Sequence, residues 1–563
     1  MEAREIRQKF LDFFATRNHK IVPSSSLIPS DPSVLLTTAG MQQFKSYYTG
    51  VADPVKDFSS KNVASVQKSF RTSDIDEVGD ESHLTFFEML GNFSFGGYGK
   101  EQAIKLAHEF ITQELGLPIS CVTVFSGGAG VEADLKSKKI WQTLGVTNVK
   151  EEGLADVFWG PTGASGPCGP TTEIYCKNTQ GREVEIWNIV FNQFFFGGTR
   201  KELLSGLSNK KLESLSTLGV DTGMGLERLA MIVQKKTSIF ETDLFQEFFE
   251  ILPADLSLDK KRILADHARA VVFLIADSVR PDNKGSGYVL RRLLRRVLSR
   301  INLEHLKLMT DWVINKYGEV YPELPMVNIW EIIAHEHRQF EVTLELGFRK
   351  LAKIQKIDVS QAFKLYESHG VPFEVIKDRY SDLSRVEFEK EFERHQIVSR
   401  ARVVQKFSGG LADHDPKTVK LHTAHHLLLA ALQQLFGKQV KQRGSNINQE
   451  RLRFDFSFNR KLTDEEKKSV ENIVNEKIRT NLTVVKKEMS KTEAEKLGAE
   501  MEFGAKYGDT VSVYFIGEES GRAFSIEFCG GPHVTHTGEL GIFKIIKEEA
   551  VAQGIRRLKA VLE

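Results

Sequence analysis

The chain has 563 residues, 41% hydrophobic and 27% charged, and is long enough to bury several cores. Its 76 basic and 75 acidic side chains give a net charge of +1, which excludes a general attraction to nucleic acid and leaves only a local basic patch for that purpose. Four scattered cysteines exclude a disulfide framework and favour a reducing compartment. Without an apolar signal segment or a membrane-spanning run, the sequence predicts a soluble cytoplasmic protein that binds no membrane.

Three compositions follow one another along the chain. Residues 1–240 are rich in Phe and Gly and contain strand-like stretches such as EIWNIVFNQFFF. Residues 241–405 repeat apolar side chains at intervals of three and four, which predicts helices, and residues 421–563 have a mixed α/β pattern. Gly, Asp and Pro gather at residues 406–420, which we interpret as a linker. We therefore expect an α+β protein of three domains.

The first domain lacks the P-loop sequence, yet three of its segments suit a bent nucleotide. One segment is His19–Lys45, with the sequence HKIVPSSSLIPSDPSVLLTTAGMQQFK. Another is Ser69–Phe95, a predicted strand, polar loop and strand with Arg71 at the end of the first strand. A further one is Val220–Leu229, a predicted glycine turn that enters a helix carrying Arg228. Two arginines over a sheet, approached by glycine loops, suit a triphosphate.

A glycine-rich segment at residues 159–170, WGPTGASGPCGP, has its glycines at intervals of three. Such spacing allows a backbone to approach a ligand closely, and we interpret the segment as a loop. Cys168, within it, is expected to pack rather than to act as a nucleophile.

The densest basic stretch, RRLLRRVLSR, lies in the helical middle of the chain at residues 291–300. At 100° per residue its arginines fall on one half of a helix, so we expect the apolar half to pack and the basic half to face solvent. A solvated helix face is one interpretation. Contact with nucleic acid is the other, because guanidinium forks suit phosphate oxygens. The arginines concerned are Arg291, Arg292, Arg295, Arg296 and Arg300.

The last domain combines histidine and cysteine at a spacing typical of metal ligands. His422 and His426 are four residues apart in LHTAHHLLLAALQQLFG, which places them on one face of a helix expected to begin near His422. Cys529 and His533 follow in FCGGPH. One cysteine with three histidines suits Zn²⁺ in near-tetrahedral geometry, whereas a lone histidine would more often be packed or exposed. Two neighbouring histidines could replace a ligand: His425 and His536.

Together, these motifs resemble those of the alanyl-tRNA synthetases over nearly the whole chain. VPSSSLIPSDPS with AGMQQFK resembles the family's first class II motif, the segment from Arg71 through TFFEMLGNFSF its second, and DTGMGLERL its third. RPDNKGSGYVLRRLLRR and LYESHGVP resemble its two readers of the tRNA acceptor stem, and HTAHHLL and CGGPH its editing motifs. The resemblance implies a class II antiparallel sheet with flanking helices, a helical tRNA-recognition domain and an α/β editing domain.

For the reaction, the resemblance implies activation of L-alanine by ATP with Mg²⁺ and transfer to the 3′ end of tRNA(Ala). In-line attack on the α-phosphorus needs positioning and charge stabilisation rather than a general base. By resemblance, Arg71 holds the α-phosphate and Arg228 the γ-phosphate. Asp221 pairs with the alanine ammonium, and Asn188 orients its carboxylate. Further residues expected at this site are Trp159, Glu185 as a Mg²⁺ ligand, Phe87, Gly223 and Gly225.

For tRNA and editing, the resemblance implies that Asn283 inspects a G–U wobble pair and that Glu367, where the family has Asp, is the second reader. The arginines from Arg291 to Arg296 would then contact phosphates. Gln442 is expected to face a site that hydrolyses Ser-tRNA(Ala) or Gly-tRNA(Ala), where His425 and Pro532 replace threonines of the family pattern. The family's C-terminal domain is not recognised in the sequence, which predicts a short, monomeric form.

Two other functions stay open at this point. One is a free-standing deacylase with an inert N-terminal portion, against which the intact Arg71, Asp221 and Arg228 argue. The other is a non-enzymatic tRNA-binding protein with a structural zinc ion.

Overall fold

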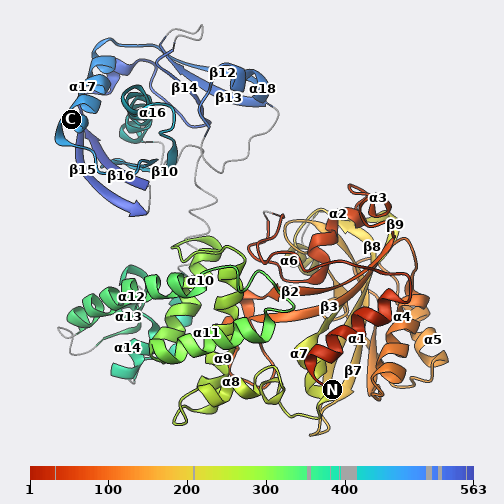
Figure 1. The fold of residues 1–563 in the computed structure, drawn as a ribbon. Coiled ribbons are helices and arrows are strands. Elements are labelled where there is room, and N and C mark those ends of the chain that lie inside the picture. The colour runs from red at the N-terminus through yellow and green to blue at the C-terminus, as the bar shows by residue number, and fades with distance from the viewer. Residues whose placement is uncertain are drawn as a thin grey trace. The chain divides into compact units, whose positions relative to one another are not determined.

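The structure is a computed structural model that describes residues 1–31, 33–206, 209–351, 357–369, 371–380, 382–391, 394, 415–501, 510–517, 523–552 and 555–563. The chain divides into two compact units, Met1–Leu383 and Ser384–Glu563, each with its own core (Figure 1). Among the described residues, no helix is long and apolar enough to cross a membrane.

A nine-stranded sheet forms the base of the first unit, counted over its described residues. Its order is β1-β2-β3-β9-β8-β7-β4-β5, with β6 paired to β7, and every pair is antiparallel except β1 with β2 and β4 with β5. The expected antiparallel sheet is therefore confirmed. The strands are β1 (Lys20–Ile21), β2 (Asn62–Phe70), β3 (Phe86–Phe95), β4 (Cys121–Phe125), β5 (Val149–Glu152), β6 (Phe158–Trp159), β7 (Gly166–Lys177), β8 (Glu183–Phe196) and β9 (Leu212–Gly225).

Helices cover this sheet and share its core. Figure 1 shows the green helices α9 to α14 on the left of the sheet in this view and α4 and α5 on its right. Phe273 of α9 stacks on Phe86 of β3 with ring centroids 4.1 Å apart. The helices are α1 (Ala3–Ala15), α2 (Lys45–Tyr48), α3 (Pro54–Phe58), α4 (Lys100–Glu109), α5 (Leu135–Thr143), α6 (Arg200–Ser205), α7 (Leu226–Val233), α8 (Gln246–Ile251), α9 (Leu258–Ala276), α10 (Gly285–Leu298), α11 (Leu303–Tyr317), α12 (Ile329–Leu351), α13 (Val359–His369) and α14 (Phe373–Arg379), with the short 3₁₀ turns η1 (Gly40–Phe44) and η2 (Thr72–Asp76).

One hydrophobic core runs through the first unit from Ala3 to Ile333 and includes residues of both the sheet and the helices. The helical character expected beyond residue 240 is confirmed by α9 to α14. The sheet and the helices pack into a single compact unit, in which no boundary at residue 240 is distinguished. The separate domains expected on either side of that residue stay a prediction.

Two glycine-rich segments differ from their predictions. The expected loop 159–170 is partly strand, because Gly166–Pro170 begins β7. A Cβ on Gly169 would lie 1.9 Å from the carbonyl oxygen of Phe191, so glycine lets β7 approach β8 rather than a ligand. The expected turn in Val220–Leu229 is also wrong, since β9 continues to Gly225 and α7 follows directly.

The second unit combines two small sheets with helices. The sheets have the orders β10-β11-β16-β15 and β12-β13-β14, and α16 packs against strands of both. This mixed α/β architecture was expected. Its elements are α16 (Pro416–Phe436), β10 (Gln442–Ile447), β11 (Leu452–Ser457), α17 (Asp464–Arg479), β12 (Val484–Ser490), α18 (Lys491–Lys496), β13 (Thr510–Ile516), β14 (Ser525–Phe528), β15 (Phe543–Ala552) and β16 (Ile555–Leu562).

The helix that carries the HTAHHLL sequence, α16, begins at Pro416 rather than near His422. The Asp415 side chain accepts a hydrogen bond from the backbone N–H of Lys417 at 2.9 Å, and proline occupies the first helical position. Both features stabilise a helix start. The end of the expected linker 406–420 is therefore helical, and the rest of it lies outside the described residues, apart from Asp415.

Candidate functional site

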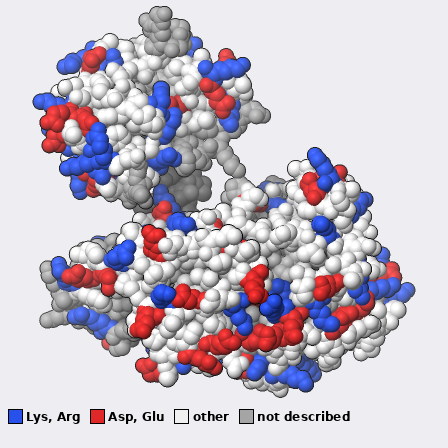
Figure 2. Space-filling model, in the orientation of Figure 1, with Lys and Arg blue, Asp and Glu red and all other residues white. Residues whose placement is uncertain are grey.

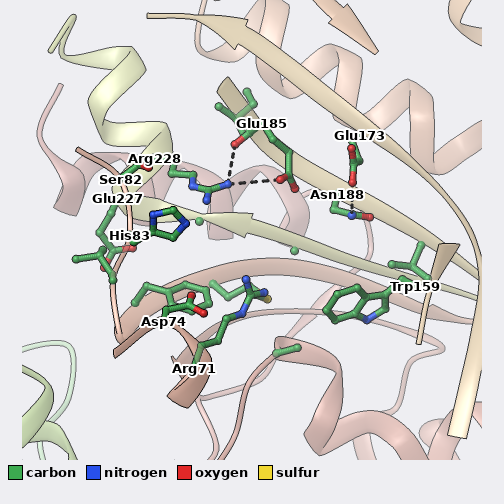
Figure 3. Close-up of a pocket in the computed structure, with 18 of the residues that line it drawn as sticks. Arg71, Asp74, Ser82, His83, Trp159, Glu173, Glu185, Asn188, Glu227 and Arg228 are labelled. Carbon is green, nitrogen blue, oxygen red and sulfur yellow. Dashed lines mark hydrogen bonds and ion pairs between the residues drawn. The ribbon is translucent and has the colours of Figure 1, made fainter. Parts of the chain in front are cut away.

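A cavity of about 330 Å³ opens beside the nine-stranded sheet of the first unit (Figure 3). It is lined by all the residues predicted for ATP and alanine, although they come from segments far apart in the sequence. These are Arg71, Phe87, Trp159, Glu185, Asn188, Asp221, Gly223, Gly225 and Arg228. The structure thus brings the whole predicted set together.

Two arginines enter this cavity from different elements, as Figure 3 shows. Arg71 directly follows β2, and its guanidinium carbon lies 5.0 Å from the ring centroid of Phe87. Arg228 lies in the first turn of α7, with Nη1 3.4 Å from the Glu185 carboxylate. Two guanidinium groups beside a carboxylate can bind a polyphosphate together with a divalent cation.

Asp221 is a buried acid in the same cavity, with 4% of its surface exposed. Burial raises the pKa of its carboxyl group to about 7. Within the described residues, no hydrogen bond reaches this side chain. In the register of β8 and β9, Asn188 lies opposite Gly223 and Val190 opposite Asp221, so Asn188 and Asp221 share one face of the sheet. An unpaired buried carboxylate of this kind can hold a cationic ligand.

The sequence interpretation missed a second buried acid, Glu173 on β7. Its carboxylate accepts hydrogen bonds from Asn188 Nδ2 at 3.0 Å, Tyr175 at 2.8 Å and Thr123 at 3.2 Å. Burial, together with the nearby charge of Glu185, raises the pKa of Glu173 to about 7. The sequence signal that could have indicated Glu173 is a glutamate within a strand of otherwise mostly buried residues. Further cavity residues that were not predicted include Asp74, His83 and Glu227.

The second unit brings the four predicted metal ligands together. Ligand atoms of His422, His426, Cys529 and His533 all lie within 4.8 Å of one another. The Cys529 Sγ is 3.4 Å from Nε2 of His422 and 3.4 Å from Nε2 of His533. Zinc bonds of about 2.3 Å to sulfur and about 2.0 Å to nitrogen, at a tetrahedral angle, separate the two ligand atoms by about 3.5 Å. The observed spacing therefore fits Zn²⁺.

Hydrogen bonds at Nδ1 fix the orientation of each histidine ring in this cluster. This arrangement leaves each Nε2 available to a metal ion, as hydrogen-bond partners behind histidine ligands commonly do. Burial alone would raise the pKa of the Cys529 thiol, but the neighbouring side chains of His422 and His426 lower it to about 6, which favours the thiolate ligand. The Nδ1 partners, which the sequence interpretation missed, are the Pro532 carbonyl for His422 at 3.0 Å, the Glu527 carboxylate for His426, and the Thr423 hydroxyl for His533 at 3.0 Å.

Comparison with known proteins identifies the family of the chain. Residues 5–439 match the family described as tRNA synthetases class II (A), and residues 511–559 match the threonyl and alanyl tRNA synthetase second additional domain. The alanine–tRNA ligase of Treponema pallidum is 41% identical, with all of this chain and 98% of that protein covered. The chain belongs to the alanyl-tRNA synthetase family.

Other members of the family align over nearly all of this chain. The alanine–tRNA ligase of Borrelia garinii is 41% identical, with both chains fully covered. That of Dehalococcoides mccartyi is 36% identical, over 99% of this chain and 79% of that protein. Among solved structures, apo histidyl-tRNA synthetase from S. aureus matches 41% of this chain and 69% of that chain with a TM-score of 0.28 and 11% identity, a level from which no conclusion follows.

The remaining editing motif residues occupy distinct places around the metal cluster. His425 is 1% exposed, neither ring nitrogen has a described partner, and its ring centroid lies 5.0 Å from that of Phe454. It forms a second possible metal group with His426 and Glu527. His536 is exposed and lies outside both groups. Gln442 is buried as the first residue of β10, and no hydrogen bond in the described part of the chain joins it to the cluster.

In the family's acceptor-stem segment, Asn283 is exposed just before α10, but the predicted exposure of the basic helix face is wrong. Arg291 and Arg295 pair with Glu336, whereas Arg292 and Arg296 pair with Asp76. Carboxylates from α12 and η2, which are remote in sequence, therefore cover the arginines. The exposed fractions of the four side chains are 18% for Arg291, 14% for Arg295, 21% for Arg292 and 6% for Arg296. Figure 2 likewise shows acidic and basic side chains interspersed on the visible face. The side chain of Glu367, on α13, lies outside the described residues.

Proposed function

We propose that this chain is an alanine–tRNA ligase, which activates L-alanine with ATP and transfers it to the 3′ end of tRNA(Ala). The observation that carries the proposal is the convergence, in one cavity, of two arginines, a buried unpaired carboxylate and the other predicted residues. An oxygen of the alanine carboxylate attacks the α-phosphorus of ATP, and the bond to the leaving pyrophosphate breaks. Bond formation and bond breaking both shift negative charge among the phosphate oxygens, and positioned guanidinium groups stabilise that charge.

Each cavity residue has a role in this proposal. Arg71 binds the α-phosphate and Arg228 the γ-phosphate. Asp221 pairs with the alanine ammonium, Asn188 orients the alanine carboxylate, and Trp159 limits the size of the side chain accepted. Phe87 supports Arg71 from beneath. Gly223 and Gly225 form part of the cavity wall against which the ligand lies. Glu185 is the Mg²⁺ ligand, since its carboxylate is 35% exposed at the cavity.

On the tRNA side, we propose that Asn283 and Glu367 read the wobble pair of the acceptor stem. Asn283 is exposed, as a base contact requires. Phosphate contact by Arg291, Arg292, Arg295 and Arg296 stays a prediction, and the salt dependence of tRNA binding tests it.

For the second unit, we propose that a zinc ion bound by His422, His426, Cys529 and His533 supports hydrolysis of Ser-tRNA(Ala) or Gly-tRNA(Ala). Bound Zn²⁺ would supply a fixed positive centre. Four protein ligands fill a tetrahedron and leave no open position for a reacting water. The four residues therefore organise the editing pocket or orient the tRNA terminus, and Gln442 lies on the strand that follows α16.

One set of assays on a single preparation of the full chain tests these proposals. An alanine–tRNA ligase shows alanine-dependent exchange of pyrophosphate into ATP, aminoacylation of tRNA(Ala) and deacylation of Ser-tRNA(Ala). A free-standing deacylase would show only the last activity, and a tRNA-binding protein none of the three. We also propose that the chain works as a monomer in the cytoplasm, where its substrates are found; light scattering and cell fractionation test those two points.

A further inference from the structure

Glu336 is a buried carboxylate on α12, on the helix face that also buries Ile333 and Phe340. Its side chain is 1% exposed, and its Oε1 lies 2.8 Å from Arg295 Nη2. Arg291 Nε lies 3.1 Å from the same oxygen, as an ion pair without hydrogen-bond geometry. Burying a carboxylate is costly unless charged partners offset the lost hydration, and here two arginines of α10 do so.

Arg291 extends this contact to the exposed residue Asn283. Its Nη1 donates to Asn283 Oδ1 at 2.5 Å, and its Nη2 donates to the carbonyl oxygen of Pro281 at 3.2 Å. A guanidinium group has only donors, so the amide atom that faces Arg291 must be the oxygen. The amide nitrogen Nδ2 is therefore directed away, and no residue in the described part of the chain accepts a hydrogen bond from it.

We propose that Glu336 is a positioning residue for acceptor-stem discrimination, acting through Arg291 on the amide of Asn283. The inference rests on the proposed function, in which Asn283 reads the wobble pair. With its oxygen held by Arg291, Asn283 presents only a donor, which selects a base acceptor. An amide free to turn over would offer its oxygen equally well and would read donors and acceptors alike.

A purely structural clamp between α10 and α12 is the simpler role for Glu336, and the other flank of α10 supplies a matched control. Asp76 also pairs with two arginines of this helix, Arg292 and Arg296, and ties it to η2. No hydrogen bond joins Asp76 to residues 281–283 in the described structure. Removing either carboxylate therefore takes one ion-pair partner from two arginines, but only the loss of Glu336 frees the amide of Asn283.

The test compares full-length Glu336→Gln and Asp76→Asn proteins with the unchanged chain. Aminoacylation kcat/KM is measured on two tRNA(Ala) transcripts that differ only in having the G–U wobble pair or a G–C pair at that position. We expect the ratio of the two values to fall about fivefold for Glu336→Gln, the factor that one lost hydrogen bond carries, and to stay unchanged for Asp76→Asn. Alanine-dependent pyrophosphate exchange, which needs no tRNA, should stay within about twofold for both.

The Asn283→Ala protein separates the hypothesis that Asn283 reads the wobble pair from the hypothesis that Glu336 positions Asn283. If it loses discrimination while Glu336→Gln keeps it, the inference about Glu336 is wrong and the proposed reader stands. If Asn283→Ala keeps discrimination, the reader itself is wrong. If Glu336→Gln fails to fold, Arg291→Lys replaces it in the test. A lysine ammonium beside Glu336 lacks the second nitrogen with which the arginine side chain donates to Asn283. An unchanged ratio in Arg291→Lys then overturns the inference, and a fallen ratio supports it.

Discussion

The carboxylate of Glu527 is hydrogen-bonded to Nδ1 of His426, and both side chains are buried. This contact fixes the ring so that Nε2 is its remaining nitrogen, and that atom has no partner among the described residues. A carboxylate behind a histidine ligand orients the ring and raises its basicity. In the proposed zinc site, Glu527 would therefore orient His426 towards the metal ion.

Replacing Glu527 by Gln should weaken zinc binding by about 10- to 100-fold, the range found when such an outer partner is lost. Competition with a chromophoric chelator measures the affinity. Glu488→Gln, at an exposed residue on β12, serves as the control and should bind zinc like the unchanged chain. Equal affinity in the Glu527 and Glu488 variants would remove Glu527 from the site.

Replacing Cys529 by Ser should abolish metal binding and deacylation of Ser-tRNA(Ala) together, because a neutral hydroxyl is a poor substitute for a thiolate ligand. Alanine-dependent pyrophosphate exchange should survive, since its residues lie in the other compact unit. Metal content and both activities are measured on one preparation. Full zinc occupancy in the Cys529→Ser protein would contradict the ligand assignment.

The Asp221→Ala protein should lose alanine-dependent exchange. The alanine ammonium would lack its partner in a buried cavity, which costs about 3–5 kcal/mol of binding. The surface acid Asp311 supplies a matched control, and its Asp311→Ala protein should exchange normally. Exchange at the unchanged rate in Asp221→Ala would exclude the residue from alanine binding.

Alanine binding should also depend on pH. Because burial raises the Asp221 pKa to about 7, this group is largely neutral at lower pH in the free protein and cannot pair with an ammonium. The KM for alanine in the exchange assay should therefore rise by up to about tenfold for each pH unit below about 7 and level off above it. Glu173, whose pKa is also raised to about 7, titrates in the same range, so the profile is repeated with Glu173→Gln. A flat profile in that variant would contradict the role of Asp221.

Replacing Arg296 by Gln should lower stability, because its buried guanidinium donates to the Ile75 carbonyl at 3.2 Å and to Asp76 at 3.1 Å. Loss of a charged hydrogen bond in a buried setting costs about 1.5–3 kcal/mol, which a thermal unfolding experiment detects as a lower Tm. Lys307→Gln removes an exposed pair with Asp311 and should change the Tm little. A flattened salt dependence of tRNA binding with an unchanged Tm would instead show that Arg296 meets phosphate.

Local sequence patterns predict the elements well where neighbours along the chain decide the structure. The strand–loop–strand around Arg71 and the helices of the middle segment are examples, since alternation and helical spacing are local properties. The strand that ends at Gly225 was predicted as a turn because it is rich in glycine. Its glycines instead make room for side chains that are remote in sequence. A Cβ on Gly219 would lie 2.4 Å from the Tyr48 ring, and one on Gly223 2.9 Å from Met89 Sδ.

The candidate sites divide in the same way. Residue types and spacing are enough to predict that His422 and Cys529 belong to one cluster, because few chemistries use that combination. The contacts that orient the other two residues of the cluster, His426 and His533, were missed, since their partners Glu527 and Thr423 differ from other polar residues only in where the fold places them. The prediction of an exposed basic helix face was wrong for the same reason. No residue near Arg291 in the sequence indicates that a carboxylate of α12 pairs with it.

The proposed metal ligands lie far apart along the chain, and this separation has a consequence for assembly. His422 and Cys529 are 107 positions apart, one on α16 and the other after β14. A bound ion would act as a cross-link that closes this long loop, and closing a loop of that length lowers the entropy of the unfolded chain. During synthesis, the ion can be captured only after the ribosome has released the second pair of ligands. Zinc binding would then be a late step, which follows the synthesis of α16 and of strands β10 to β14.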